Sequence, residues 1–281
     1  MSNSIEARAL SKDLGGFALK KLTFSLPAGC IMGLIGENGA GKSTTIRLLL
    51  GLLRRDGGDV SVLGYDPERA EPELREEIGV VFDDCPFAET LTRRDVRRIL
   101  AAAYRTFDGG KFDSLADSFS LPERQKLKEY SRGMRMKLSI AAALSHASRL
   151  LILDEPTSGL DPVARDELLD ILLDFIQDER RSVLISSHIL SDLEKACDYI
   201  TFIHEGGIVF SEEKDTLLEK YVVAKGSADE IAALDPGAVI GVRHSQFGCE
   251  ALVERGAAAG LLNERASIED IMLYYIKGDA K

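Results

Sequence analysis

A glycine-rich segment in the first fifth of the chain carries the residue types that bind phosphate groups. Its spacing is GxxxxGK[ST], in which glycines let the backbone curl so that several N–H groups point at phosphate oxygens. The lysine can reach the β- and γ-phosphates of a nucleotide, and the hydroxyl after it can bind Mg²⁺. Cys30–Ile35 before the segment predicts a buried strand and Lys42–Leu53 predicts the helix that must follow. The segment consists of Gly36, Glu37, Asn38, Gly39, Ala40, Gly41, Lys42, Ser43 and Thr44.

A pair of acidic residues follows a second apolar run. Leu150–Leu153 (LLIL) is typical of a central parallel strand covered on both faces, and Asp154 and Glu155 come directly after it. Asp154 at the end of the strand would hold Mg²⁺, usually through water. Glu155 could polarise an attacking water molecule. Combined with the phosphate-binding loop, this pair predicts a P-loop nucleoside triphosphatase.

Three further segments narrow this prediction. SGLD at Ser158–Asp161 follows the acidic pair, and Ser186–His188 ends the next expected strand. Upstream, YSRGM at Tyr130–Met134 stands at the start of an expected helix. In this order the five motifs resemble those of the ATP-binding cassette (ABC) ATPases, over about residues 4–220. Within that family, YSRGM, the acidic residues after Phe82 and the ending SIEDIMLYYIKG resemble the ATPase subunits of ABC-2-type exporters, including bacitracin- and lantibiotic-resistance transporters.

The resemblance implies a fold and an organisation. It implies an α/β fold of the P-loop type with a mainly parallel core sheet, a helical subdomain that carries the signature motif, and a small α+β region at the C-terminal end. We therefore expect an ATPase domain at residues 1–212, with the helical subdomain at about 86–145, and an accessory region at 213–281. That accessory region could be regulatory, could stabilise a dimer, or could pack over the last strands of the core, and we favour the packing role.

The resemblance also implies roles for single residues. The signature motif in this family covers the γ-phosphate of ATP bound to a partner copy, and Asp161 matches a loop at the dimer seam. His188 matches a histidine that contacts the γ-phosphate and helps to hold the attacking water. Judged alone, the first residue of the signature is an ordinary helix N-cap and His188 is a structural histidine. The signature positions are Ser131, Arg132, Gly133 and Met134.

Two departures from the family pattern concern the Mg²⁺ ligands and the contact with adenine. The family usually has Gln in the loop after the strand expected at Val80–Phe82, whereas this chain has Asp83. A carboxylate can still bind Mg²⁺, so Asp83 is a candidate ligand beside Ser43 and Asp154. The family also stacks adenine on an aromatic residue, commonly at the place of Leu14. Because Leu14 is not aromatic, Phe17 is the candidate for that contact.

The function that the resemblance implies is ATP hydrolysis coupled to transport. ATP and Mg²⁺ are the expected cofactors, and the expected partners are a second copy of the chain and integral membrane subunits on separate chains. We expect the protein on the cytoplasmic face of the cell membrane, held there by the membrane subunits, and we expect the direction of transport to be outward. The alternative is a soluble ABC-type ATPase that acts in macromolecular assembly.

The wider composition sets limits on this reading. The chain has 281 residues, with 35 Lys and Arg against 46 Asp and Glu, which gives a formal net charge of −11. An acidic chain argues against a surface built to bind nucleic acid, so we expect no nucleic-acid partner. The four cysteines are far apart, and reduced thiols in a cytosolic protein are expected. We expect neither a secretory signal nor a membrane span, because no apolar stretch is long enough.

The elements that must position these motifs follow from the apolar pattern. Further parallel strands are expected at Ser182–Ser186 and Tyr199–Ile203. Within the helical subdomain, helices are expected at Val96–Tyr104, Phe112–Phe119 and Met134–Ser145. In the C-terminal region, strands are expected at Val222–Ala224 and Ala238–Val242, followed by a helix at Ile268–Ile276 with Ser267 as its cap and Asp270 three positions on.

Overall fold

A six-stranded sheet forms the centre of the molecule. The computed structural model describes residues 2–69, 71–245, 248–258 and 260–278. The strand order is β5-β6-β7-β3-β8-β9, and all neighbours are parallel except β8 and β9. Every residue of β3, β6 and β7 is buried, as expected of strands covered on both faces. The strands are β3 (Ile31–Ile35), β5 (Ile78–Val81), β6 (Leu150–Asp154), β7 (Ser182–Ser186), β8 (Tyr199–His204) and β9 (Gly207–Glu213).

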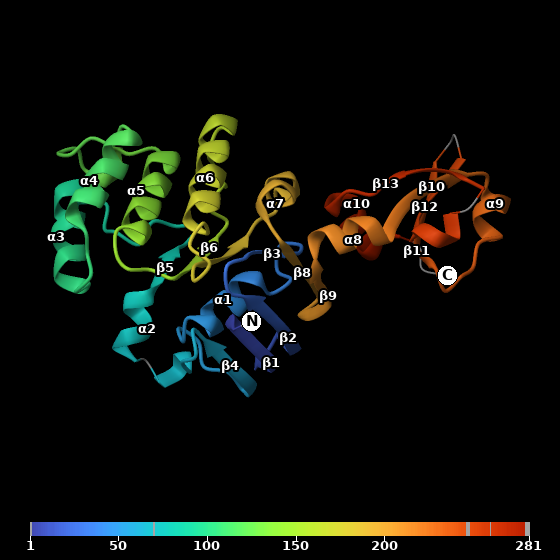
Figure 1. Cartoon of the computed structure of the whole chain (residues 1–281), viewed down its shortest axis with the longest axis horizontal. Helices are drawn as coiled ribbons and strands as arrows, with labels where there is room; N and C mark the ends of the chain where they lie inside the picture. The colour runs from blue at the N-terminus through green and yellow to red at the C-terminus, as the bar shows by residue number, and fades with distance from the viewer. Residues whose placement is uncertain (1, 70, 246–247, 259, 279–281) are drawn as a thin grey trace.

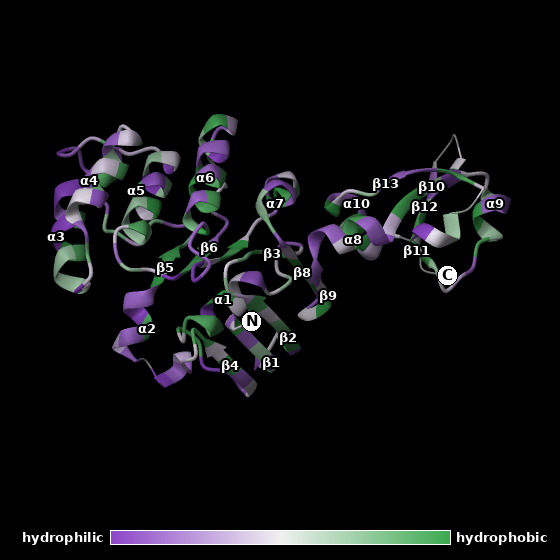
Figure 2. Ribbon diagram, viewed as in Figure 1, coloured by the Kyte–Doolittle hydropathy of each residue, from purple (hydrophilic) through white to green (hydrophobic). Residues whose placement is uncertain are grey.

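A second, antiparallel sheet, which the apolar pattern of the sequence does not predict, lies against the central one. Its order is β2-β1-β4, with β1 at Asn3–Asp13, β2 at Ala18–Pro27 and β4 at Gly57–Val62. Ile5 and Leu22 from this sheet share one apolar cluster with Leu34 and Ile152 of the central sheet. The two sheets therefore enclose a common core, and Figure 2 shows the central strands β5 and β6 coloured as hydrophobic.

Helices connect the strands of the core. They are α1 (Lys42–Leu49), α2 (Pro72–Glu77), α6 (Pro162–Phe175) and α7 (Leu190–Ala196). Helix α1 ends four residues before the predicted end at Leu53. Gly51 adopts a φ of +65° and its N–H donates to the carbonyl of Leu48. Glycine takes this left-handed conformation without steric cost, which ends the helix.

The helical subdomain stands at one end of the molecule in Figure 1. Its helices are α3 (Arg93–Ala103), α4 (Gly109–Ser118) and α5 (Arg132–Leu144). Each begins at a capping side chain, and Thr92 before α3 forms a reciprocal capping box with Asp95. The subdomain has its own apolar cluster, which includes Val96, Phe112 and Leu138. The predicted helical insert is therefore present as a packed unit.

The C-terminal region stands at the opposite end and contains an antiparallel sheet of order β11-β12-β10-β13. Helix α10 begins at the predicted cap, where Ser267 and Asp270 form a capping box. Residues 246–247, 259 and 279–281 of the predicted accessory region lie outside the described residues. The elements are α8 (Lys214–Lys220), β10 (Tyr221–Gly226), α9 (Ala228–Ala232), β11 (Val239–Ser245), β12 (Gly248–Glu254), β13 (Leu262–Arg265) and α10 (Ile268–Lys277).

Candidate active site

The glycine-rich loop joins β3 to α1, as predicted, and two of its glycines cannot be replaced without a clash. A Cβ on Gly36 would lie 2.3 Å from the carbonyl oxygen of Ile203, and one on Gly41 would lie 2.5 Å from Leu19 Cδ2. Both also have positive φ values, +154° and +117°. At both positions the backbone passes close to its neighbours, and a tight glycine-rich loop before the N-terminus of a helix is the geometry that binds phosphate.

Lys42 lies at the base of this loop and supplies its positive charge. Its Nζ donates to the carbonyl oxygens of Gly36, at 2.8 Å, and Glu37, at 3.2 Å. It also lies 3.8 Å from Glu155 Oε1. Burial lowers the pKa of Lys42, and the carboxylates of Glu155 and Asp154 oppose that shift. The ammonium group is held by weak carbonyl acceptors, so a phosphate oxygen can replace them.

Asp154 ends β6 inside a cavity of about 480 Å³ that Lys42, Ser43 and Asp83 also line. Its Oδ1 accepts a hydrogen bond of 2.6 Å from the Ser186 hydroxyl. Hydroxyl and carboxylate oxygens are the ligands that Mg²⁺ prefers, so these residues fit that ion. Among the described residues no group of three His, Cys, Asp or Glu side chains forms a metal cluster. A Mg²⁺ ion here would therefore need oxygens from a bound nucleotide.

Glu155 is held in a strained conformation by its neighbours. Its φ is +53°, which is uncommon outside glycine. Its N–H donates to the carbonyl oxygen of Ser186, at 3.1 Å, and to the Ser186 hydroxyl, at 3.0 Å. Its Oε2 lies 2.6 Å from His188 Nδ1 and accepts from the His188 N–H at 3.2 Å. The strand ends thus bring the two predicted catalytic residues into direct contact.

These residues face a cavity of about 500 Å³ that joins the first one. Its lining includes Asn38, Glu155 and His188, all predicted from the motifs. It also includes Leu190, and Met272 of α10 from the C-terminal region. Sequence reasoning missed Met272, because an apolar position in an amphipathic helix carries no sign of what it faces. Ser186 was missed as a partner of both carboxylates because its role depends on the pairing of β6 with β7.

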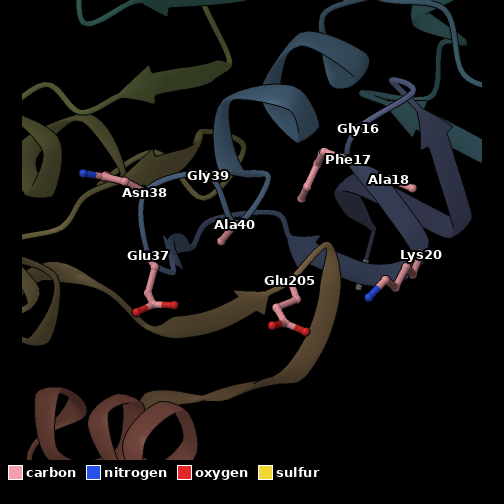
Figure 3. Close-up of a pocket in the computed structure, with 9 residues that line it drawn as sticks. All are labelled: Gly16, Phe17, Ala18, Lys20, Glu37, Asn38, Gly39, Ala40 and Glu205. Atoms are coloured by element: carbon pink, nitrogen blue, oxygen red, sulfur yellow. The ribbon is translucent and has the colours of Figure 1, made fainter.

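Phe17 lies beside the phosphate-binding loop, as Figure 3 shows. Phe17 lines a cavity of about 390 Å³ together with residues 37–40. Its ring atom Cζ is 3.0 Å from the point where a Cβ on Gly41 would lie. Leu14 is 49% exposed. Of the two residues, Phe17 is therefore the one with a flat apolar face next to the phosphate-binding loop.

The signature motif starts α5, and Ser131 caps the helix by accepting a hydrogen bond of 3.1 Å from the Met134 N–H. Arg132 donates to Asp83 and, at 3.1 Å, to the Ser158 hydroxyl. Arg132 of the signature and Asp83 of the loop after β5 thus form an ion pair. In the part of the chain that the structure describes, residues 131–134 line neither the 480 Å³ nor the 500 Å³ cavity. The signature and the loop are not brought together within one chain.

Asp161 caps α6, because its carboxylate accepts from the N–H groups of Val163, at 3.1 Å, and Ala164, at 3.0 Å. The backbone hydrogen bond from Ala164 is the main reason that the pKa of Asp161 is lowered. Its carboxylate is exposed at the end of the loop that follows Glu155, but both hydrogen bonds are local. The side chain therefore fixes the shape of the loop.

Comparison with known proteins gives a consistent set of similarities. The family model described as ABC transporter matches residues 19–158. The ABC transporter ATP-binding protein YtrB of Bacillus subtilis (strain 168) is 32% identical over 219 residues, which cover 78% of this chain and 75% of that protein. The bacitracin transport ATP-binding protein BcrA of Bacillus licheniformis is 34% identical, with 74% and 69% covered. A dimeric ATP-binding cassette, MJ0796, in a post-hydrolysis state with ADP and phosphate, superposes with a TM-score of 0.66 at 20% identity, covering 75% of this chain and 98% of that one.

Proposed function

The chain belongs to the ATP-binding subunits of ABC transporters, and from that premise we propose that two copies bind two ATP molecules between them and drive separate membrane subunits. One observation carries this proposal. The two cavities that Lys42, Glu155 and His188 line lack the signature residues of the same chain, and Ser131 lies outside both. A second copy can supply that segment, since a serine hydroxyl and a helix N-terminus both favour an anion.

The arrangement of side chains supports hydrolysis of the bound nucleotide. Lys42 places a positive charge where the β- and γ-phosphates bind, which stabilises charge on the transferred phosphoryl group. Glu155 accepts a proton as water attacks the γ-phosphorus and ADP leaves. His188 holds the Glu155 carboxylate through two hydrogen bonds, so the base keeps one orientation. Mg²⁺ held by Ser43 and Asp154, with Asp83 as a further candidate, would neutralise phosphate charge.

Coupling to a membrane subunit is proposed at the segment 83–92 and the cavity beside it. This apolar cavity of about 300 Å³ is lined by residues of α2 and β5 together with Leu52, Phe82 and Tyr104. Leu52 is 64% exposed, which leaves apolar surface for a partner helix. None of the helices among the described residues is long and apolar enough to cross a membrane. Similarity to a fluoroquinolones export ATP-binding protein of Mycobacterium tuberculosis, 36% identical over 193 residues, supports outward transport.

The dimer and the catalytic base are tested together with Glu155→Gln. We expect the variant to bind ATP as the wild type does, to hydrolyse it roughly a hundredfold or more slowly, and to accumulate as a dimer in ATP. Light scattering after size-exclusion chromatography measures the dimer, and phosphate release measures the rate. Lys42→Ala is the matched control, because it should lose binding and dimer together. Wild-type hydrolysis by Glu155→Gln would show that another group is the base.

The membrane role is tested by purifying the tagged chain from detergent-solubilised membranes of its host and identifying the proteins that come with it. A stoichiometric protein with several membrane spans would support transport. Soluble partners alone, with the chain absent from membranes, would support the alternative of an assembly ATPase. In that case the ATP hydrolysis would stand and the transport role would not.

A further inference from the structure

The C-terminal helix α10 reaches the catalytic cavity. Met272 of this helix lines the 500 Å³ cavity together with Asn38, Glu155 and His188. It lies 117 residues beyond Glu155 in the chain, in the region that the sequence predicts as accessory. The accessory region therefore contributes a side chain to the wall of the cavity in which the proposed hydrolysis occurs.

A continuous apolar contact joins α10 to the helix that follows His188. Helix α7 begins at Leu190, two residues after His188, and α10 packs against it. Ile268 and Ile271 of α10 are fully buried in the same cluster as Leu190 and Leu193 of α7. Because buried side chains are packed at the density of a crystal, a shift of α10 must move α7 or leave a void.

A polar contact fixes the same two helices. The N–H of Ile268, in the first turn of α10, donates to Glu194 Oε2 of α7 at 3.3 Å. The first N–H groups of a helix have no partner inside it, so this carboxylate satisfies one of them. The two helices are thus linked at the start of α10 and along its buried face, while Met272 projects toward the cavity.

Met272 and Leu190 give the cavity an apolar side next to the histidine. The other lining residues are backbone and polar groups of the loop together with Asp83, Glu155, Ser158 and His188. Both apolar side chains thus line the cavity that also holds the 2.6 Å contact between His188 Nδ1 and Glu155 Oε2. Methionine suits this place because its flexible side chain fills irregular gaps.

We propose that Met272 is a positioning residue for the His188–Glu155 pair, and that α10 acts on this pair through α7. This rests on the proposed ATPase function. Nucleotide affinity should depend little on α10, since Lys42 and the backbone of the glycine-rich loop are the groups proposed to contact the phosphates. The rate of hydrolysis should depend on it, because the base is effective only in one orientation.

The test compares Met272→Ala with Leu273→Ala in the full chain. Leu273 is the next residue of α10, is half-buried, and is not among the lining residues of the cavity within the described part of the chain. We expect Met272→Ala to lower kcat at least fivefold while the Kd of a non-hydrolysable ATP analogue changes less than twofold. Leu273→Ala should change neither. Equal effects of the two variants, or a parallel loss of affinity, would overturn the proposal.

A second readout does not depend on hydrolysis. The chain has four histidines, so the His188 imidazole resonances can be assigned by comparison with His188→Ala. Met272→Ala should shift them and Leu273→Ala should leave them in place. If Met272→Ala leaves the His188 resonances unshifted, Met272 does not position His188, even if the chain is an active ATPase. If Met272→Ala shifts the His188 resonances but the wild-type chain does not hydrolyse ATP, the contact is upheld and the proposed function is wrong.

Discussion

The hydroxyl of Ser186 holds both carboxylates at the end of β6, which makes Ser186→Ala a direct test of how the site is positioned. Ser186 is fully buried. Its hydroxyl donates to Asp154 Oδ1 at 2.6 Å and accepts from the Glu155 N–H at 3.0 Å. Alanine keeps the strand and removes both bonds. The Glu155 N–H retains the Ser186 carbonyl, whereas Asp154 loses its hydrogen bond from this side chain.

The magnitude follows from these contacts. A hydrogen bond to a charged group contributes about 1.5–3 kcal/mol to stability. For a chain of this size each kcal/mol corresponds to roughly 2–4 °C in Tm, so we expect Tm to fall by roughly 3–12 °C. Loss of a partner that orients a ligating carboxylate typically costs about 10–100-fold in activity or metal affinity. We therefore expect kcat for ATP hydrolysis to fall within that range.

Ser182→Ala is the matched control, because Ser182 is equally buried at the other end of β7. Its hydroxyl lies 2.8 Å from the Ser4 hydroxyl and accepts from the Gly29 N–H at 3.1 Å, so no charged group is involved. Thermal unfolding and steady-state phosphate release are measured for both variants. We expect Ser182→Ala to lose stability and keep its kcat. The reasoning is refuted if Ser186→Ala keeps wild-type kcat, or if both variants lose activity equally.

Three further predictions concern the contact of Phe17 with adenine, the Arg132–Asp83 ion pair and stability in acid. Phe17→Ala should weaken ATP binding by about 2–10-fold through lost stacking, yet leave inorganic tripolyphosphate binding unchanged in calorimetric titrations; equal losses for both ligands would exclude base stacking. Arg132→Ala should change Tm by less than about 4 °C, because the Arg132 and Asp83 side chains are 55% and 48% exposed and such pairs contribute at most about 1 kcal/mol. The Arg55 guanidinium lowers the pKa of Asp66 from 3.8 to about 2, so that pair stabilises the fold above pH 3.8 and loses its effect as pH falls toward 2. Asp66→Asn should therefore have a lower free energy of unfolding in urea than the wild type at pH 6. A difference between the two proteins that does not become smaller below about pH 4 would contradict this reasoning.

Much of the site could be predicted because its motifs are local. The glycine spacing predicts a loop whose backbone binds phosphate, and together with that loop an apolar run that ends in an acid predicts a buried strand with its carboxylate at the sheet edge. Ser182–Ser186 is a strand with the bounds that its apolar pattern predicts. The caps at Ser131 and Ser267 form as expected, since each depends on residues three positions apart.

Features that depend on tertiary packing could not be predicted in this way. Arg132 and Asp83, which form an ion pair, are 49 positions apart in the sequence and belong to different motifs. The antiparallel sheet of β1, β2 and β4 was not predicted, because irregular register interrupts the alternation of buried and exposed residues along β1. The position of Met272 depends on how α10 packs on α7, which no local pattern encodes.

The place of β3 in the central sheet has a consequence for synthesis of the chain. The strand before the phosphate-binding loop ends at Ile35, and its neighbours in the sheet are β7 and β8, which begin at Ser182 and Tyr199. Pairings of such long sequence separation form slowly, and a growing chain exposes β3 without its neighbours until they are made. The helical subdomain, by contrast, closes its cluster from residues 96–142. A nascent chain would thus hold a folded signature helix long before it could hold ATP, and a chain arrested before residue 204 would never gain a complete loop scaffold.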